Sequence, residues 1–359
     1  MRRRQLLGAL ATTVGAGCGY AAGAGDDRGR VRIGDELPGI GNLQVDANDS
    51  IVIAYREQPP TALPSLEHEP RLGVYDWTGD LLATVPLESS ARTVAVGDRI
   101  AVHTEDGLAV SVSVDRLDMD EGIAWRVPLE ERATLVGTRE SLAFVRSPDG
   151  LRAFAGGTAA WTATFDRPVT EATVTAEHVV ASDGRTVRGF DHDGTERWAS
   201  SVVAADLAGR GRYTVLHAAG TITLLADGKP VWERAVGPVA SPPRLAADLV
   251  LVLERTGHRR GRRLIGIDRD RGKDRFAIDG VADIEGPVAA SEDGVVLVDD
   301  RCVVRHVRDG RVAWRRSLDR GTCRVRAARI EADRVALLFA DGHLIRFQRV
   351  AEQPRGWAP

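Results

Sequence analysis

Short apolar runs, separated by turns that contain glycine or aspartate, recur along most of the chain. Examples are Leu142–Phe144, Val179–Val180, Val215–Leu216, Val250–Leu251 and Val295–Val296. Runs this short, bounded by turn residues, predict β-strands rather than helices. Asp-Gly between two apolar runs is a strong signal for a hairpin, because glycine adopts positive φ without strain. The pattern therefore predicts an all-β protein.

A tryptophan recurs in one local setting within this pattern. The copies are Gly156-Gly157-x3-Trp161, Asp193-Gly194-x3-Trp198, Asp227-Gly228-x3-Trp232 and Asp309-Gly310-x3-Trp314. In the same frame, Phe276 replaces tryptophan, Trp125 follows a long insertion, and Leu82 stands at the aromatic position of the first unit. The spacing is 43 residues from Leu82 to Trp125 and then 36, 37, 34, 44 and 38 to Trp314. Seven units are therefore traceable, each with three visible strands.

Repeats of about 40 residues are typical of β-propellers with four-stranded blades. The fourth strand is expected in the variable segments, such as Asp206 to Arg212 and Ala282 to Ala289. The last apolar runs, 335–339 and 344–347, form an incomplete unit that Arg30 to Ile33 would complete, closing the ring and removing an open sheet edge. Eight blades are the first prediction and seven the alternative. We expect the repeated aromatics to pack each blade against the next, burying about 150–250 Å² each. They are Trp125, Trp161, Trp198, Trp232, Phe276 and Trp314.

The clearest copy, Val187 to Trp198, resembles the pyrroloquinoline-quinone-like (quinoprotein-type) β-propeller repeat, as does Ile265 to Lys273. The resemblance implies the propeller fold and covers most of the chain. The family includes quinone-dependent dehydrogenases and also a non-enzymatic lipoprotein that assists outer-membrane protein assembly. The adjacent cysteine pair of the dehydrogenases is absent here, and Asp191-His192-Asp193-Gly194 lacks the further oxygen ligands of a calcium loop. We therefore predict a hairpin at Asp191 to Gly194, and no quinone cofactor, metal or catalytic residue.

The first residues predict export and anchoring. Residues 1–17 carry Arg2-Arg3-Arg4, an apolar stretch and small residues, which form an export signal of the twin-arginine type. Gly17-Cys18 resembles a lipobox, which makes Cys18 the expected site of lipid attachment. Residues 18–30 have the composition of a flexible tether, and residues 31–359 are expected to form a single propeller domain. The expected location is extracytoplasmic, on the cell membrane.

Two cysteines remain after Cys18, and two interpretations of them stay open. An extracytoplasmic location permits a disulfide between Cys302 and Cys323, and two buried free thiols are the alternative.

The net charge and the positions of the charged residues and histidines limit the classes of function that the protein can have. The net charge of −3 gives no basic stripe for nucleic acid. The one dense basic cluster is expected in the insertion between two strands of the sixth unit. It is a solvated hairpin tip, or a contact for anionic lipid or an acidic partner. It consists of Arg259, Arg260, Arg262 and Arg263, and a stiff loop in the first unit adds Pro59, Pro60 and Pro64. His103, His217 and His343 stand at roughly equivalent strand positions, but no histidines have metal-ligand spacing.

The predicted fold, the predicted extracytoplasmic location and the lack of a catalytic motif together favour a lipid-anchored, non-catalytic scaffold that binds a protein partner. A quinone-dependent redox protein and a propeller that binds a sugar or small ligand are the alternatives. No nucleophile elbow, zinc-protease motif or P-loop is present.

Overall fold

The protein's computed structural model describes residues 30–32, 43–47, 51–56, 70–76, 80–113, 123–246, 248–257, 261–281, 289–291, 294–299, 301–308, 310–318, 325–331, 334–339 and 343–348. All regular elements in these residues are β-strands. Nothing in the described part is a helix with the length and apolar character needed to cross a membrane.

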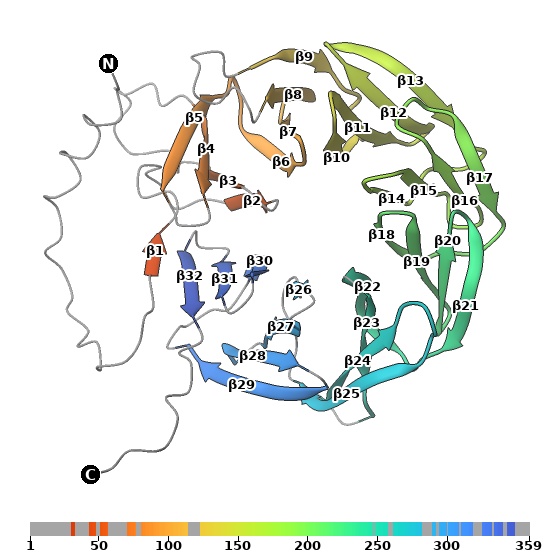
Figure 1. Ribbon diagram of the computed structural model, residues 1–359. Helices are drawn as coiled ribbons and strands as arrows, with labels where there is room; N and C mark the ends of the chain where they lie inside the picture. The colour runs from red at the N-terminus through yellow and green to blue at the C-terminus, as the bar shows by residue number, and fades with distance from the viewer. Residues whose placement is uncertain are drawn as a thin grey trace, which may run out of the picture.

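The described strands form eight four-stranded antiparallel sheets, which follow one another around a common centre (Figure 1). The first sheet contains β2 (Leu43–Ala47), β3 (Ile51–Arg56), β4 (Arg71–Asp76) and β5 (Leu81–Pro86), and the second contains β6 (Ala91–Val96), β7 (Arg99–Thr104), β8 (Leu108–Ser113) and β9 (Trp125–Pro128). The third contains β10 (Thr134–Arg139), β11 (Leu142–Ser147), β12 (Gly150–Ala155) and β13 (Thr158–Thr164). The fourth contains β14 (Glu171–Val174), β15 (Val179–Ser182), β16 (Val187–Phe190) and β17 (Glu196–Ser200).

The remaining four sheets continue the ring. They are β18 (Asp206–Arg210), β19 (Tyr213–Ala218), β20 (Thr221–Ala226) and β21 (Lys229–Ala235); β22 (Val239–Ala246), β23 (Leu249–Arg255), β24 (Arg262–Asp268) and β25 (Asp274–Val281); β26 (Ala289–Ser291), β27 (Gly294–Val298), β28 (Val303–Arg308) and β29 (Arg311–Ser317); and β30 (Val325–Glu331), β31 (Arg334–Phe339) and β32 (His343–Gln348) with β1 (Arg30–Arg32).

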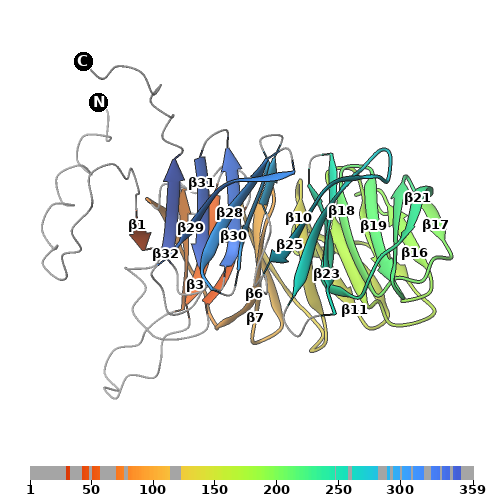
Figure 2. The ribbon, with the colours of Figure 1, turned by 90° about the horizontal axis from the view of Figure 1, so that it is seen from below.

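In each sheet the strands follow one another from the centre of the ring to its rim in chain order, except that β30 is the inner strand and β1 the outer strand of the closing sheet (Figure 1). Seen from the side, the strands run between the two faces of a β-propeller (Figure 2). The strand predicted at Asp206 to Arg212 as the fourth of its unit is present as β18, the first strand of its sheet. In the other example, β26 includes Ala289, and residues 282–288 lie outside the described part.

The hydrophobic core lies between neighbouring sheets. One cluster joins Phe144 and Leu151 of the sheet β10–β13 to Val179 and Phe190 of the sheet β14–β17, with Trp161 packed against it. Phe144, Leu151 and Val179 are fully buried. Because both faces of a sheet are covered by other sheets, its middle strands are continuous apolar runs, which explains the pattern in the sequence.

Closure of the ring joins the two ends of the chain. β1 pairs antiparallel with β32, with Val31 opposite Leu344, so a strand from the start of the chain completes the sheet formed by its end. The predicted closure is confirmed. It leaves no open edge on β32 in that sheet, which an unclosed ring would expose to pairing with another chain.

The aromatic position in the first unit was assigned wrongly. In the sheet β14–β17, Gly189 pairs with Trp198 and a bulge follows. In the sheet β2–β5, the residue that corresponds to Trp198 is Ala83, which pairs with Val74, while Leu82 lies in the bulge and is 46% exposed. The ring of Tyr75 lies beside Gly73 of the same strand. These two residues alternate with Val74 and therefore lie on the opposite face of the sheet from Ala83, which leaves the equivalent position without an aromatic residue.

Candidate functional site

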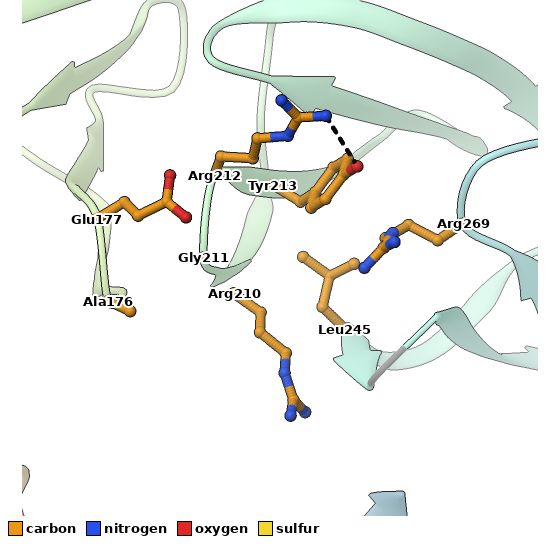
Figure 3. Close-up of a pocket in the computed structure, with 8 residues that line it drawn as sticks. All are labelled: Ala176, Glu177, Arg210, Gly211, Arg212, Tyr213, Leu245 and Arg269. Atoms are coloured by element: carbon orange, nitrogen blue, oxygen red, sulfur yellow. Dashed lines mark hydrogen bonds between the residues drawn. The ribbon is translucent and has the colours of Figure 1, made fainter. Parts of the chain in front are cut away.

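A cavity of about 410 Å³ opens among the turns of three successive sheets (Figure 3). Most of its lining comes from the turn between β14 and β15, the turn between β18 and β19, and the end of β22. The turn between β24 and β25 contributes Arg269. The lining residues are Ala176, Glu177, Arg210, Gly211, Arg212, Tyr213, Leu245 and Arg269. Since these turns all lie at the same end of their sheets, the cavity belongs to one face of the propeller.

Tyr213 lies between two arginine side chains in this cavity. The guanidinium carbon of Arg269 lies 4.2 Å from the centre of the Tyr213 ring, and that of Arg212 lies 5.2 Å from it. Arg212 Nη2 also donates a hydrogen bond to Tyr213 Oη at 3.3 Å (Figure 3). The face of an aromatic ring attracts cations, so both guanidinium groups are held in place by the same ring.

Both of these arginines are firmly charged. The hydrogen bond to Tyr213, with the nearby carboxylates of Asp227 and Glu177, raises the pKa of Arg212 above its usual value. The hydrogen bond to Asp270 likewise raises the pKa of Arg269 above its usual value. The cavity therefore presents fixed positive charge beside an aromatic ring and the apolar side chain of Leu245.

Thr175 organises the turn between β14 and β15. Its buried hydroxyl accepts hydrogen bonds from the backbone N–H groups of Glu177 and His178, at 3.2 and 2.9 Å. The same hydroxyl lies 2.7 Å from the carbonyl oxygen of Gly211 in the neighbouring sheet, to which it donates. One side chain therefore fixes the conformation of this turn and ties it to the turn from β18 to β19.

Glu177 also belongs to a second group of polar side chains beside the cavity. His178 Nε2 lies 3.2 Å from Asp227 Oδ1, and His178 Nδ1 lies 3.7 Å from Asp191 Oδ1. One ligand atom each from Glu177, His178 and Asp227 lie within 4.8 Å of one another. This group could not be predicted from the sequence, because His178 and Asp227 are 49 residues apart and meet only when two sheets pack side by side.

Two of the residues predicted to contact a partner, Arg262 and Arg263, lie away from this cavity. Arg262 and Arg263 begin strand β24 and are not in a hairpin tip, which corrects the prediction. They pair with Arg255 and Glu254, at the end of β23 opposite to Leu249, and so lie on the face away from the cavity. Arg263 Nε lies 3.6 Å from Asp279 Oδ1. Arg259, Arg260, Pro59, Pro60 and Pro64 lie outside the described residues.

The cysteines are placed only in part. Cys302, in the turn between β27 and β28, is buried and disulfide-bonded. Cys323, its predicted partner, and Cys18, the predicted lipid site, lie outside the described residues, so their roles stay predictions.

The three histidines do not share one position. His103 in β7 and His217 in β19 occupy the fifth place of the second strand of their sheets. His343 begins β32, which is a third strand, so it was wrongly grouped with them. His217 Nδ1 lies 2.9 Å from Asp206 Oδ2. The described structure therefore gives no common histidine site.

The repeated aromatics all lie on outer strands. Trp125, Trp161, Trp198, Trp232, Phe276 and Trp314 are in β9, β13, β17, β21, β25 and β29, respectively. Tyr213, Arg212, Arg269, Glu177 and His178 were not predicted as site residues. The one signal for them was the run Arg210-Gly211-Arg212-Tyr213 at a turn, which says nothing about the neighbouring sheets.

Comparison with known proteins identifies the repeat. A family model described as "Outer membrane protein assembly factor BamB" matches residues 110–225 and again residues 218–350. The chain belongs to this family. The predicted membership of the pyrroloquinoline-quinone-like repeat family is thereby confirmed. A search of curated proteins finds no match.

Solved structures similar to this BamB-family chain agree on the fold. The crystal structure of BamB from Moraxella catarrhalis has a TM-score of 0.62 at 13% identity, over 89% of this chain and 98% of that one. The computationally designed Ika8 protein has a TM-score of 0.66 at 14% identity, over 89% and 99%. Hsv2 from Kluyvelomyces marxianus has 0.54 at 10% identity, over 84% and 90%. At these identities the likeness shows the fold alone.

Proposed function

We propose that this protein is a non-catalytic scaffold, anchored by lipid on Cys18 outside the cytoplasm, that binds a protein partner through the cavity of Tyr213. The observation that carries the proposal is the ring of Tyr213 held between the guanidinium groups of Arg212 and Arg269. Tyrosine and arginine are enriched among the residues that dominate binding energy at protein interfaces. The description of the family as an assembly factor supports the same role by analogy.

The charge of the cavity indicates the chemistry of the partner segment. Arg210, Arg212 and Arg269 line it with one carboxylate, Glu177, while Leu245 adds apolar surface. A segment with an acidic side chain next to an apolar or aromatic one would complement this surface, since a guanidinium can bind a carboxylate through two parallel hydrogen bonds. The cavity volume also falls within the range of small-molecule sites, about 300–1,000 Å³, so a small acidic ligand is the second candidate.

We also propose that no quinone takes part. A planar quinone needs an aromatic side chain free to stack on it. Trp161, Trp198 and Trp232 instead lie against glycines in the turns of the following sheets, and the cavity lining includes no tryptophan. The packing of these three tryptophans supports this proposal, because it leaves none of the three free to stack on a quinone.

The eight four-stranded sheets support an eight-bladed ring as the form of the scaffold, in which the cavity spans three neighbouring blades. A rigid closed ring would hold the turns of these blades in fixed relative positions, as a preformed binding surface requires.

Photo-crosslinking in native membranes tests the proposal. Tyr213 is replaced by the photo-reactive residue p-benzoylphenylalanine in the full chain, and Arg185 is replaced in the same way as a control. Arg185 is exposed in the turn between β15 and β16, at the end of its sheet opposite to the turn of Glu177. We expect one identified envelope protein to be captured from position 213, and to be lost with Arg269→Glu. Capture of the same proteins from both positions, or of none, contradicts partner binding at this cavity.

The anchor has a separate test. Cys18→Ser is expected to move the protein from the membrane fraction to the soluble extracytoplasmic fraction and to abolish incorporation of radiolabelled fatty acid. Unchanged membrane association and labelling would contradict the lipid anchor without bearing on the cavity.

A further inference from the structure

The side chains of Glu177, His178 and Asp227 converge from two neighbouring sheets. Glu177 and His178 come from the turn between β14 and β15, and Asp227 comes from the turn between β20 and β21. We propose that these three residues form a binding site for a divalent transition-metal ion of the zinc class. This inference does not depend on the proposed partner.

The spacing of the three ligand atoms suits such an ion. Zinc binds histidine nitrogen and carboxylate oxygen at about 2.0–2.2 Å, which places tetrahedral ligand atoms about 3.3 Å apart. His178 Nε2 and Asp227 Oδ1 are already 3.2 Å apart. The full set lies within 4.8 Å, and Glu177 is exposed, so rotation of its side chain can close the remaining gap. The fourth position would remain open to water.

The second nitrogen of His178 supports a ligand role. Nδ1 is buried and has no hydrogen-bond partner among the described residues, and Asp191 Oδ1 lies 3.7 Å from it. Histidines that bind metals commonly donate their other ring N–H to a carboxylate, which fixes the ring and strengthens the bond to the metal. Asp191 is itself held by a hydrogen bond from Arg197 Nε at 2.5 Å. A shift of less than about 1 Å would therefore give His178 this second partner.

The charge of the group also favours a cation. Within the described part of the chain, Glu177 receives no side-chain hydrogen bond, and the Asp227 carboxylate has only His178 beside it as a partner. Two carboxylates and one neutral imidazole carry a charge that matches a divalent ion. Arg212 is the competing cation, because both carboxylates act on its pKa. Exposure of Glu177 and Asp227 provides the entry path.

Calorimetry on the full-length protein, purified in detergent without a histidine tag and stripped with chelator, tests the site. ZnCl₂ is titrated into the wild type, His178→Ala and His217→Ala. His217 is the matched control, because it pairs with one carboxylate, that of Asp206, and lies outside the proposed ligand set. We expect one zinc ion per chain, an affinity weakened about 10–100-fold or more by His178→Ala, and no change with His217→Ala.

Two further variants keep the result interpretable. Glu177→Gln removes a ligand charge from an exposed position, and it serves if His178→Ala fails to fold. Arg212→Gln removes the competing cation and is expected to tighten zinc binding several-fold. The inference is overturned if the wild type does not bind zinc below millimolar concentration. Equal weakening by His178→Ala and His217→Ala, or equal affinity in Glu177→Gln and the wild type, would also overturn it.

Discussion

The indole of Trp198 lies over Gly189 of the adjoining strand, and a Cβ at Gly189 would come within 3.0 Å of the ring. A Cβ at Gly228, in the turn of the next sheet, would come within 3.0 Å of the same ring. Trp161 meets Gly194, and Trp232 meets Gly272, in the same way. The aromatic residue of one repeat therefore packs against the turn glycine of the next repeat.

Gly228→Ala is expected to destabilise the protein through this contact. Gly228 has φ of +74°, and an added Cβ would clash with the Trp198 ring. Gly184→Ala is the matched control, since Gly184 has φ of +85° and nothing within 4 Å of a new Cβ. Backbone strain of about 1 kcal/mol should affect both variants, and the clash should add about 1–3 kcal/mol to Gly228→Ala alone. Urea unfolding measures both; equal midpoints would contradict the packing role.

The tryptophans differ in one hydrogen bond, which predicts different costs for the same substitution. Trp161 Nε1 donates to the carbonyl oxygen of His192 at 2.7 Å. Trp198 Nε1 is buried without an acceptor among the described residues. The following turn explains this, because it spans residues 191–195 for Trp161 and only 227–228 for Trp198.

Trp161→Phe should therefore lower the free energy of unfolding by about 1 kcal/mol more than Trp198→Phe. Both changes remove similar ring area, so each variant serves as the other's control. Chemical unfolding monitored by far-UV circular dichroism gives the comparison. A larger loss for Trp198→Phe would show that the hydrogen bond to His192 has no net value.

Much of the fold was predictable because the repeated residues are those that form the contacts between neighbouring sheets. The strands of the apolar runs, the packing of the aromatics against the next sheet, and β18 followed from the spacing. The error at Leu82 has a local cause, because a bulge moves the equivalent position to Ala83. A count of residues after a turn does not reveal where a strand bulges.

The candidate sites were not predictable in the same way. Tyr213 and Arg269 belong to different sheets, as do His178 and Asp227. Tyr213 begins β19 and the other three lie in turns, and these local sequences are ordinary. Their chemistry arises only where the ends of successive sheets meet. A single sequence shows the turns but not the distances between them.

His103 should make stability depend on pH. Burial, with a smaller contribution from Arg92, lowers the pKa of His103 below its usual value of 6.5. The unfolded chain therefore takes up a proton at a pH where the folded protein does not. The stability that this group contributes is complete above pH 6.5 and is lost as the pH falls from there toward the folded-state pKa, by at most about 1.4 kcal/mol per pH unit.

We expect melting temperatures measured between pH 7.5 and pH 5.5 to fall more steeply for the wild type than for His103→Gln. His217→Gln is the control, since His217 occupies the same strand position in another sheet. If His103→Gln has the same slope as the wild type, proton uptake at His103 does not control the acid sensitivity.

Closure by β1 can be tested with two truncations that differ by three residues. A chain that begins at Arg30 keeps β1, and a chain that begins at Ile33 lacks it, while both lack the segment that carries Cys18. Loss of β1 removes the strand that pairs with β32 and leaves its edge open. With two or three backbone hydrogen bonds lost, the free energy of unfolding should fall by about 1–4 kcal/mol, and the open edge should promote association. Light scattering after size exclusion and urea unfolding distinguish the two chains. If both are equally stable and monomeric, pairing of the chain ends is not what closes the ring in solution.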